Sequence, residues 1–156
     1  MIPAEYDEIR PYLPEELPQV FEELIADPEF QAAMGYAFQG MPFEQIAAAM
    51  RASKTNLEFQ KALVYPFIKG VIQKLSSGIT MSYDNKEHMA KSLCISNHRD
   101  IIMDSAFLCI VFVETVGNTV EIAIGDNLLI RPWIKKLVRV NRSFIVQRSA
   151  SIREML

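Results

Sequence analysis

The stretch "TVEIAIGDNLLIRPWIKKLVRVNRSFIVQR", residues 119–148, decides the fold class of this chain. It begins and ends with short apolar runs that contain β-branched residues, "TVEIAIG" and "RSFIVQR", and both runs are typical of strands. Residues 132–140 lie between them and have the pattern of a helix that starts with a proline. This order predicts two parallel strands, because parallel neighbours need a crossover connection that is usually helical.

A third apolar run of the same kind lies upstream, in "KSLCIS" at residues 91–96, and residues 101–114 predict the helix that follows it. We therefore expect an α/β fold with a mostly parallel βαβαβ core, incomplete at the C-terminus. Ligands of such sheets bind beyond the carboxyl ends of the strands, and His98 lies there, just after the first predicted strand. Asp100 is placed to cap the helix that follows.

The N-terminal half predicts helices and shows no obvious chemistry. Residues 14–26 have apolar side chains at helical spacing. Asp27 and Pro28 then predict the cap and the first residue of a second helix. Residues 55–75 form the longest amphipathic segment, which Pro66 is expected to kink or divide.

The net charge of −3 conceals an asymmetry between the two ends of the chain. Residues 1–30 carry nine acidic side chains and one arginine, whereas residues 131–156 carry seven basic side chains and one glutamate. The basic C-terminal part either attracts anions or forms a solvated helix face. We do not expect nucleic acid as a partner, because the aromatic residues do not alternate with the basic ones as stacking platforms would.

The composition predicts one globular domain. With 156 residues, 50% of them hydrophobic, the chain is long enough to bury a substantial core. None of its apolar runs approaches the roughly 20 residues that a membrane-spanning helix needs. The N-terminus is acidic and proline-rich, unlike a secretory signal, so we expect a cytoplasmic protein.

Two segments make the chain resemble a known family. "NHRDIIMD", residues 97–104, is similar to block I of the glycerolipid acyltransferases, and "AIGDNLLIRPWIKKLVRVNRSFIVQRS", residues 123–149, is similar to their block II in order, spacing and polarity. The resemblance of these blocks covers roughly residues 92–149. The whole chain, including its helical N-terminal region, is most similar to the bacterial glycerol acyltransferases of the glycerol-3-phosphate/lysophosphatidate acyltransferase superfamily. The resemblance implies a helical N-terminal region at residues 1–78 and the N-terminal part of an acyltransferase domain at residues 79–156.

The implied activity is transfer of a fatty acyl group from acyl-CoA or acyl-carrier protein to a hydroxyl of a phosphorylated glycerol, in phospholipid synthesis. Such an enzyme would bind peripherally to the inner membrane, and the resemblance implies no cofactor and no metal ion. The sequence stops at Leu156, before the Glu-Gly-x-Arg segment of block III, so we expect a truncated product. Two alternatives stay open, namely a non-catalytic remnant of the family and a hydrolase in which His98 activates water.

The resemblance also assigns the catalytic residues. His98 is implied as the general base that removes the hydroxyl proton, because a neutral imidazole suits that step near pH 7. Asp104 is implied as the carboxylate that orients and stabilises the imidazole. It lies six residues after His98, one more than in the family, so Asp100 is the alternative partner.

Three polar residues are implied in substrate binding. Arg148 ends the run "FIVQR" and matches the phosphate-binding arginine of the family, since a guanidinium can grip a phosphate through two parallel hydrogen bonds. Arg99 is a further candidate for the same role. Asn127 either contacts the substrate or completes the turn after "EIAIG".

Overall fold

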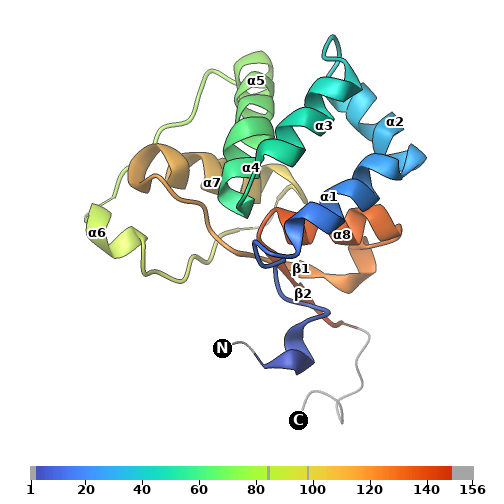
Figure 1. The fold of residues 1–156 in the computed structure, drawn as a ribbon. Helices are drawn as coiled ribbons and strands as arrows, with labels where there is room; N and C mark the ends of the chain where they lie inside the picture. Colours follow the sequence, from blue (N-terminus) through green and yellow to red (C-terminus); the bar gives the residue numbers. More distant parts are fainter. Residues whose placement is uncertain (1–2, 84, 98, 149–156) are drawn as a thin grey trace. The chain divides into compact units, whose positions relative to one another are not determined.

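The computed structural model describes residues 3–83, 85–97 and 99–148, and their backbone forms two compact units. The first unit contains the described residues within 1–60 and 121–156, and the second contains those within 61–120. The fold is mixed α/β and mostly helical (Figure 1). The predicted boundary at residue 78, between a helical region and an acyltransferase domain, stays a prediction.

The first unit begins with a short 3₁₀ turn, η1 (Ala4–Tyr6), and continues with helices α1 (Leu17–Ala26), α2 (Pro28–Ala37), α3 (Phe43–Ala52) and α4 (Asn56–Phe59). The predicted start of α2 is confirmed. The Asp27 side chain accepts hydrogen bonds from the backbone N–H groups of Glu29 and Phe30, and Pro28 occupies the first turn. These groups have no partner inside the helix, so the cap fixes where α2 begins.

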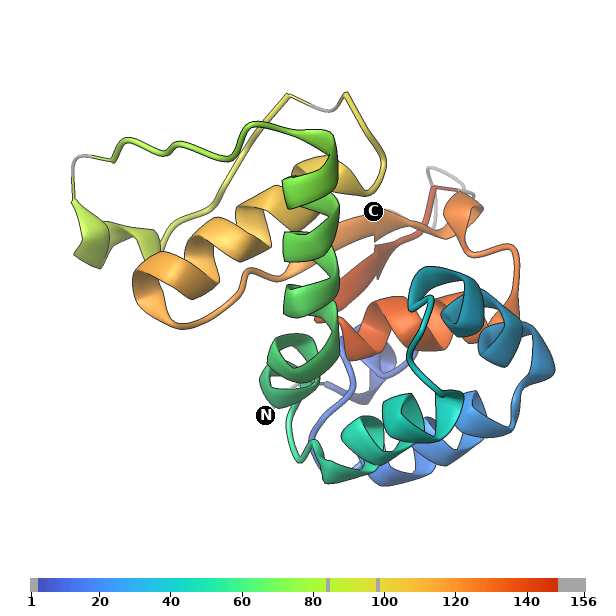
Figure 2. The same cartoon turned by 90° about the horizontal axis from the view of Figure 1, so that it is seen from above.

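A two-stranded parallel sheet completes this unit. Strands β1 (Ile122–Gly125) and β2 (Ser143–Val146) pair in register, and the chain between them forms the 3₁₀ turn η3 (Asp126–Leu128) and helix α8 (Pro132–Val140). Figure 2 shows β1 beside β2, with α8 packed on β2. The strand–helix–strand prediction for residues 119–148 is therefore confirmed, including the parallel pairing.

The core of the first unit is formed by side chains from the N-terminal and the C-terminal parts of the chain. The largest fully buried side chains of the described residues all belong to it: Leu17, Phe21, Leu24, Phe30, Ile46, Met50 and Val140. They come from α1, α2, α3 and α8. In addition, the backbone N–H of Ile145 donates to the carbonyl of Ile9 at 2.8 Å, which ties β2 to the N-terminal segment.

Ion pairs also connect the acidic N-terminal part of this unit with its basic C-terminal part. Lys135 pairs with Glu8 at 2.8 Å, and Lys136 pairs with Glu23 at 2.8 Å. Arg131 contacts Glu29 at 3.1 Å in the same way. The two opposite charge excesses expected from the sequence are thus partly matched to each other within this unit. Each exposed pair contributes little to stability, about 1 kcal/mol or less.

Among the basic residues of the C-terminal part that the structure describes, Arg139 is buried, with 5% of its surface exposed. Its guanidinium donates hydrogen bonds to the backbone carbonyls of Arg10, at 2.7 Å, and Asp7. It also lies over the ring of Tyr12, 3.9 Å from the centroid. A buried charge must be well hydrogen-bonded to be tolerated, and these contacts satisfy that requirement.

The second unit is built on two longer helices, α5 (Tyr65–Leu75) and α7 (Met103–Val116), with a short helix α6 (Lys86–Met89) between them. Ile68, Ile72 and Ile110 form its buried cluster. The predicted long helix at residues 55–75 is divided, because the π-helical stretch η2 (Gln60–Val64) lies just before Pro66 in α5. A proline removes a backbone donor and crowds the preceding turn, which accounts for the division.

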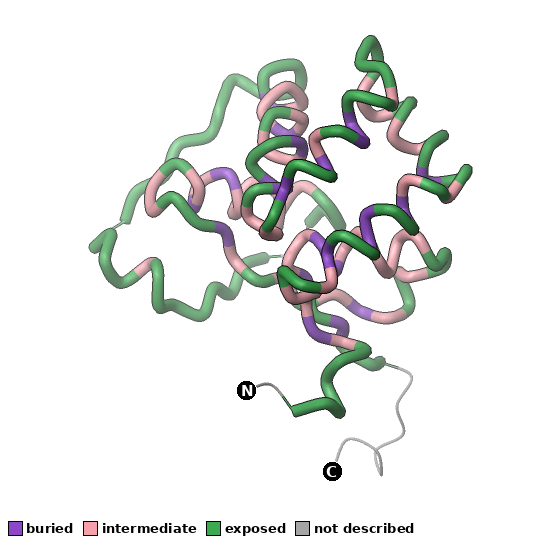
Figure 3. The backbone as a smooth tube through the Cα atoms, viewed as in Figure 1, coloured by how far each residue is buried: buried purple, intermediate pink, exposed green. Residues whose placement is uncertain are grey.

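The predicted strand at residues 91–96 is absent, so the full βαβαβ core is not confirmed. The structure describes this segment as irregular and exposed, with Leu93 87% and Ile95 88% accessible (Figure 3). A strand requires a hydrogen-bonded neighbour, and the described part of this segment makes only turn-type backbone bonds, from Lys91 and Ser92 to the end of α6. The prediction of a strand from the apolar pattern of residues 91–96 was therefore wrong, because such a pattern does not by itself provide a neighbouring strand.

No helix among the described residues has the length and apolar character that crossing a bilayer would require.

Candidate functional site

The predicted site residues lie in both units. Asn127 and Arg148 belong to the first unit, and Arg99 and Asp104 belong to the second. His98, the predicted general base, lies outside the described residues. The block II residues and the block I residues are therefore described separately.

The block II residues meet at the carboxyl end of β1, over Gly125. A Cβ atom added to Gly125 would lie 2.5 Å from Oδ1 of Asn127 and 2.8 Å from Nε of Arg148. Both side chains therefore occupy the space where Gly125 has no side chain of its own. The φ angle of Gly125 is −71°, which any residue adopts, so glycine is required here for close approach.

The backbone at the end of β2 is fixed to the same place. The N–H of Arg148 donates to Oδ1 of Asp126 at 3.1 Å, and Val146 pairs with Gly125 in the parallel register. Parallel strands bring their carboxyl ends to one edge, which explains why residues about twenty positions apart converge. Arg148 and Asn127 are both exposed. A guanidinium and a side-chain amide so placed can donate hydrogen bonds to an anion, with the carboxylate of Asp126 nearby as a counter-charge.

The block I residues form a second polar cluster, at the start of α7. Oδ1 of Asp100 accepts hydrogen bonds from the backbone N–H groups of Ile102, at 2.9 Å, and Met103, at 2.8 Å. Asp100 therefore holds the turn that leads into α7, although the N-cap position itself is occupied by Ile102 and not, as the sequence had led us to expect, by Asp100. The helix begins at Met103, two residues later than expected, and this later start leaves Asp104 in its first turn.

Asp104 itself points back along the chain. Its Oδ2 accepts hydrogen bonds from the backbone N–H of Arg99, at 2.6 Å, and from that of Asp100, at 2.9 Å. Asp104 is half-buried, whereas Arg99 and Asp100 are exposed. Sequence reasoning placed Arg99, Asp100 and Asp104 near one another but did not foresee these backbone contacts.

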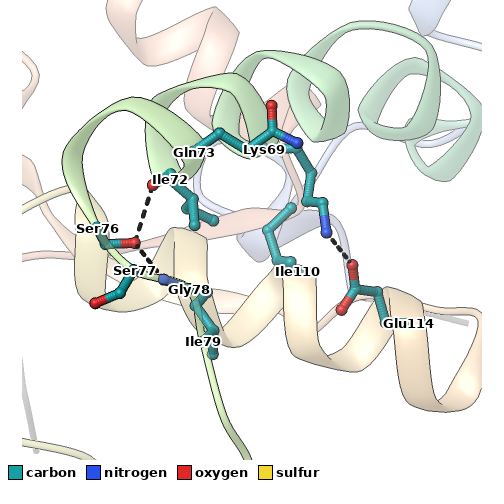
Figure 4. A pocket seen from close by; sticks show the side chains of 9 residues that line it. All are labelled: Lys69, Ile72, Gln73, Ser76, Ser77, Gly78, Ile79, Ile110 and Glu114. Carbon is teal, nitrogen blue, oxygen red and sulfur yellow. Dashed lines mark hydrogen bonds and ion pairs between the residues drawn. The ribbon is translucent and has the colours of Figure 1, made fainter.

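The second unit also contains an open cavity of about 430 Å³ between α5 and α7, to which no sequence motif pointed. Figure 4 shows Lys69 and Glu114 at one end of it and the Ser76–Gly78 turn at the other. Lys69 donates to Oε1 of Glu114 at 2.6 Å, and the Tyr65 hydroxyl donates to the same oxygen at 2.9 Å. The Lys69 hydrogen bond lowers the pKa of Glu114, and the hydrogen bond to Glu114 raises the pKa of Tyr65.

These groups neutralise one another, and their spacing of 45 positions leaves no signal in the sequence. None of the predicted site residues that the structure describes, namely Arg99, Asp104, Asn127 and Arg148, lines the cavity. Among the residues that the structure describes, no group of three or more histidine, cysteine, aspartate or glutamate side chains is arranged to hold a metal ion.

Comparison of the chain with protein-family models, with curated proteins and with solved structures gave no match.

Proposed function

We propose that this protein is an acyltransferase of the glycerolipid type, which moves a fatty acyl group from acyl-CoA or acyl-carrier protein to a hydroxyl of a phosphorylated glycerol. Two sequence blocks at residues 97–104 and 123–149 support the proposal. The observation that carries it is the convergence of Asn127 and Arg148 over Gly125. That pair offers an exposed cation and an amide at the edge of a parallel sheet, where ligands of such sheets bind.

The acceptor would be recognised by its phosphate. Arg148 would donate two parallel hydrogen bonds to phosphate oxygens, and Asn127 would add an amide donor beside them. The close approach that Gly125 permits would keep both donors together. Arg99 is the further candidate for binding the phosphate.

The transfer step would use His98 as general base. Its imidazole takes the proton of the acceptor hydroxyl while that oxygen attacks the thioester carbonyl, which becomes tetrahedral. When the intermediate collapses, the carbon–sulfur bond breaks, and the imidazolium returns the proton to the departing thiolate. The carboxylate of Asp104 would stabilise the imidazolium between these two steps. The products are an ester and a free thiol, with no covalent enzyme intermediate, no cofactor and no metal ion. The reaction would take place at the inner membrane surface, to which the protein would bind peripherally from the cytoplasm.

The test is a thiol-release assay on the purified protein with palmitoyl-CoA, with and without glycerol 3-phosphate. We expect thiol release that depends on the acceptor, together with formation of an acylated glycerol phosphate. His98→Ala should abolish the activity and leave the free energy of unfolding nearly unchanged. The matched control is His88→Ala, which changes the other histidine of the chain, an exposed residue of α6, and should leave the rate unchanged.

Three outcomes would contradict the proposal. Free fatty acid formed without any acceptor would indicate the hydrolase. Absence of thioester cleavage with every acceptor would indicate the non-catalytic remnant. Activity that survives His98→Ala would remove the proposed base from the reaction.

A further inference from the structure

We infer that Asp104 is a positioning residue, whose carboxylate binds the backbone that directly follows His98 and fixes it to α7. We call the two hydrogen bonds of this carboxylate, from the N–H groups of Arg99 and Asp100, the lock. This inference rests on the proposed function for its consequence in catalysis. Its structural basis is independent of that function, because it lies entirely in hydrogen bonds of the described residues.

The first observation is where the carboxylate binds. A single oxygen of Asp104, Oδ2, accepts the N–H groups of Arg99 and Asp100 at 2.6 and 2.9 Å. The N–H of Arg99 belongs to the peptide group that joins it to residue 98 in the chain. Hydrogen bonds to an ionised acceptor are roughly twice as strong as neutral ones. The carboxylate therefore acts on the peptide next to the proposed base, in addition to any effect on the imidazole ring.

The second observation is that the two carboxylates act in series on the same stretch of backbone. Asp104 binds the N–H of Asp100, while Asp100 binds the N–H groups of Ile102 and Met103 at the start of α7. The arrangement is related to a capping box, in which two side chains near the start of a helix bind backbone N–H groups of its first turn. Four backbone N–H groups at the start of α7, those of Arg99, Asp100, Ile102 and Met103, are thus held by two carboxylates.

The third observation is that Asp104 belongs to a helix that is itself packed in the core of the second unit. α7 carries Ile110, which packs in the buried cluster with Ile68 and Ile72. The loop before α7 is exposed at Arg99 and Asp100 and has little packing of its own. Its conformation therefore depends on the two carboxylates, which transmit the position of a packed helix to an otherwise weakly held loop.

The lock predicts different behaviour for two substitutions at one position. Asp104→Asn keeps a side-chain carbonyl oxygen that can accept both N–H groups, whereas Asp104→Ala keeps none. We expect trypsin to cut after Arg99 about tenfold to a hundredfold faster in Asp104→Ala than in the wild-type protein, and to cut Asp104→Asn within a few-fold of it. Amide hydrogen exchange of Arg99 and Asp100, measured by NMR, should follow the same order.

Two controls separate the lock from a general loss of structure. Cleavage after Lys91, an exposed residue outside the network, should not differ among the three proteins. The denaturation midpoint should stay similar in Asp104→Asn and Asp104→Ala. Equal cleavage and exchange in all three proteins would overturn the inference, and so would Asp104→Asn behaving as Asp104→Ala does.

Activity measurements keep this inference distinct from the proposed function. If the wild-type protein shows no acyl transfer, the proposed function fails, yet the order of cleavage rates still decides the lock. If the protein is active, Asp104→Ala should lower kcat more than it raises the KM of the acceptor, because a loosened loop affects the base and spares Arg148 and Asn127, the main proposed phosphate contacts. A reduced kcat in Asp104→Asn with an intact lock would measure the effect of the carboxylate charge on the imidazole alone.

Discussion

The two compact units differ in how they cover their apolar side chains. In the first unit, large side chains such as Phe21 and Leu24 are almost wholly buried. In the second unit, Leu93 and Ile95 are almost wholly exposed, and the buried cluster is small. Burial of apolar area supplies most of the free energy of folding, so the first unit should carry most of the stability. The block I loop, by contrast, depends on local hydrogen bonds for its conformation.

The largest effect should come from emptying the two cores. Leu24→Ala in α1 should lower the free energy of unfolding by about 4–5 kcal/mol, because a closed core cannot collapse around the cavity. Ile72→Ala in α5 should cost only about 2–3 kcal/mol, since this side chain borders an open cavity that water can reach. Chemical denaturation of both variants measures the difference. Equal costs would refute the contrast between the units.

The next largest effect concerns the block II site of the better-packed unit. Arg148→Ala should raise the KM for a phosphorylated acceptor by the equivalent of about 1.5–3 kcal/mol and leave the KM of the acyl donor nearly unchanged. Lysine should restore binding only partly, because its point charge lacks the bidentate geometry. Stability should not change, because Arg148 is exposed.

Steady-state kinetics with donor and acceptor varied separately provide the measurement for Arg148→Ala. A change of similar size for both substrates, or for neither, would exclude the residue from the phosphate site. Gly125→Ala serves as a matched variant, since its Cβ displaces Asn127 and Arg148 without removing them. It should produce a weaker effect in the same direction.

A smaller effect should come from the aspartates that hold the start of a helix, Asp27 in the first unit and Asp100 in the second. Asp27 and Asp100 each accept two backbone N–H groups at the start of a helix. Asp27→Ala should cost about 1 kcal/mol of global stability, as is typical of helix caps. Asp100→Ala should change global stability less and should mainly accelerate amide exchange at Ile102 and Met103. If both variants shift the denaturation midpoint alike, the block I loop unfolds together with the whole protein.

The smallest effect should come from the exposed segment. Leu93→Ser should change the free energy of unfolding by less than about 0.5 kcal/mol, because the side chain is 87% exposed and loses few contacts. Chemical denaturation of Leu93→Ser and of Leu24→Ala compares the loss of unfolding free energy at the most exposed and at the most buried kind of position. A loss of 2 kcal/mol or more, as expected from burial, would mean that the segment packs in solution.

The sequence predicted correctly those elements whose start, end or order is determined by residues close together in the chain. Asp27 and Pro28 mark the start of α2, and the order of residues 119–148 predicted two parallel strands joined by a helix. The convergence of Asn127 and Arg148 was foreseeable for the same reason, because a parallel pair aligns its carboxyl ends. In each case a short sequence contains the whole physical cause.

Other features depend on partners that lie far away in the sequence. The β-branched run at 91–96 predicted a strand, but strand formation requires a neighbour that the run itself does not specify. The basic C-terminal part predicted either attraction of anions or a solvated helix face, whereas Lys135 and Lys136 pair with glutamates more than a hundred positions earlier. The backbone contacts of Asp104 were missed because it lies four positions after Asp100, whereas the capping-box pattern places the second side chain three positions after the first.

The hydrogen bond from Ile145 to Ile9 has a consequence for synthesis on the ribosome. Helices α1 to α4 emerge early, but α8 and β2, which complete their core, follow only after the whole second unit has been translated. At about 5–20 residues per second, the roughly 70 residues between α4 and α8 impose a delay of roughly 4–15 s. During that interval the nascent helices expose the apolar faces that α8 later covers, so the N-terminal core can close only once the C-terminal part of the chain has been made.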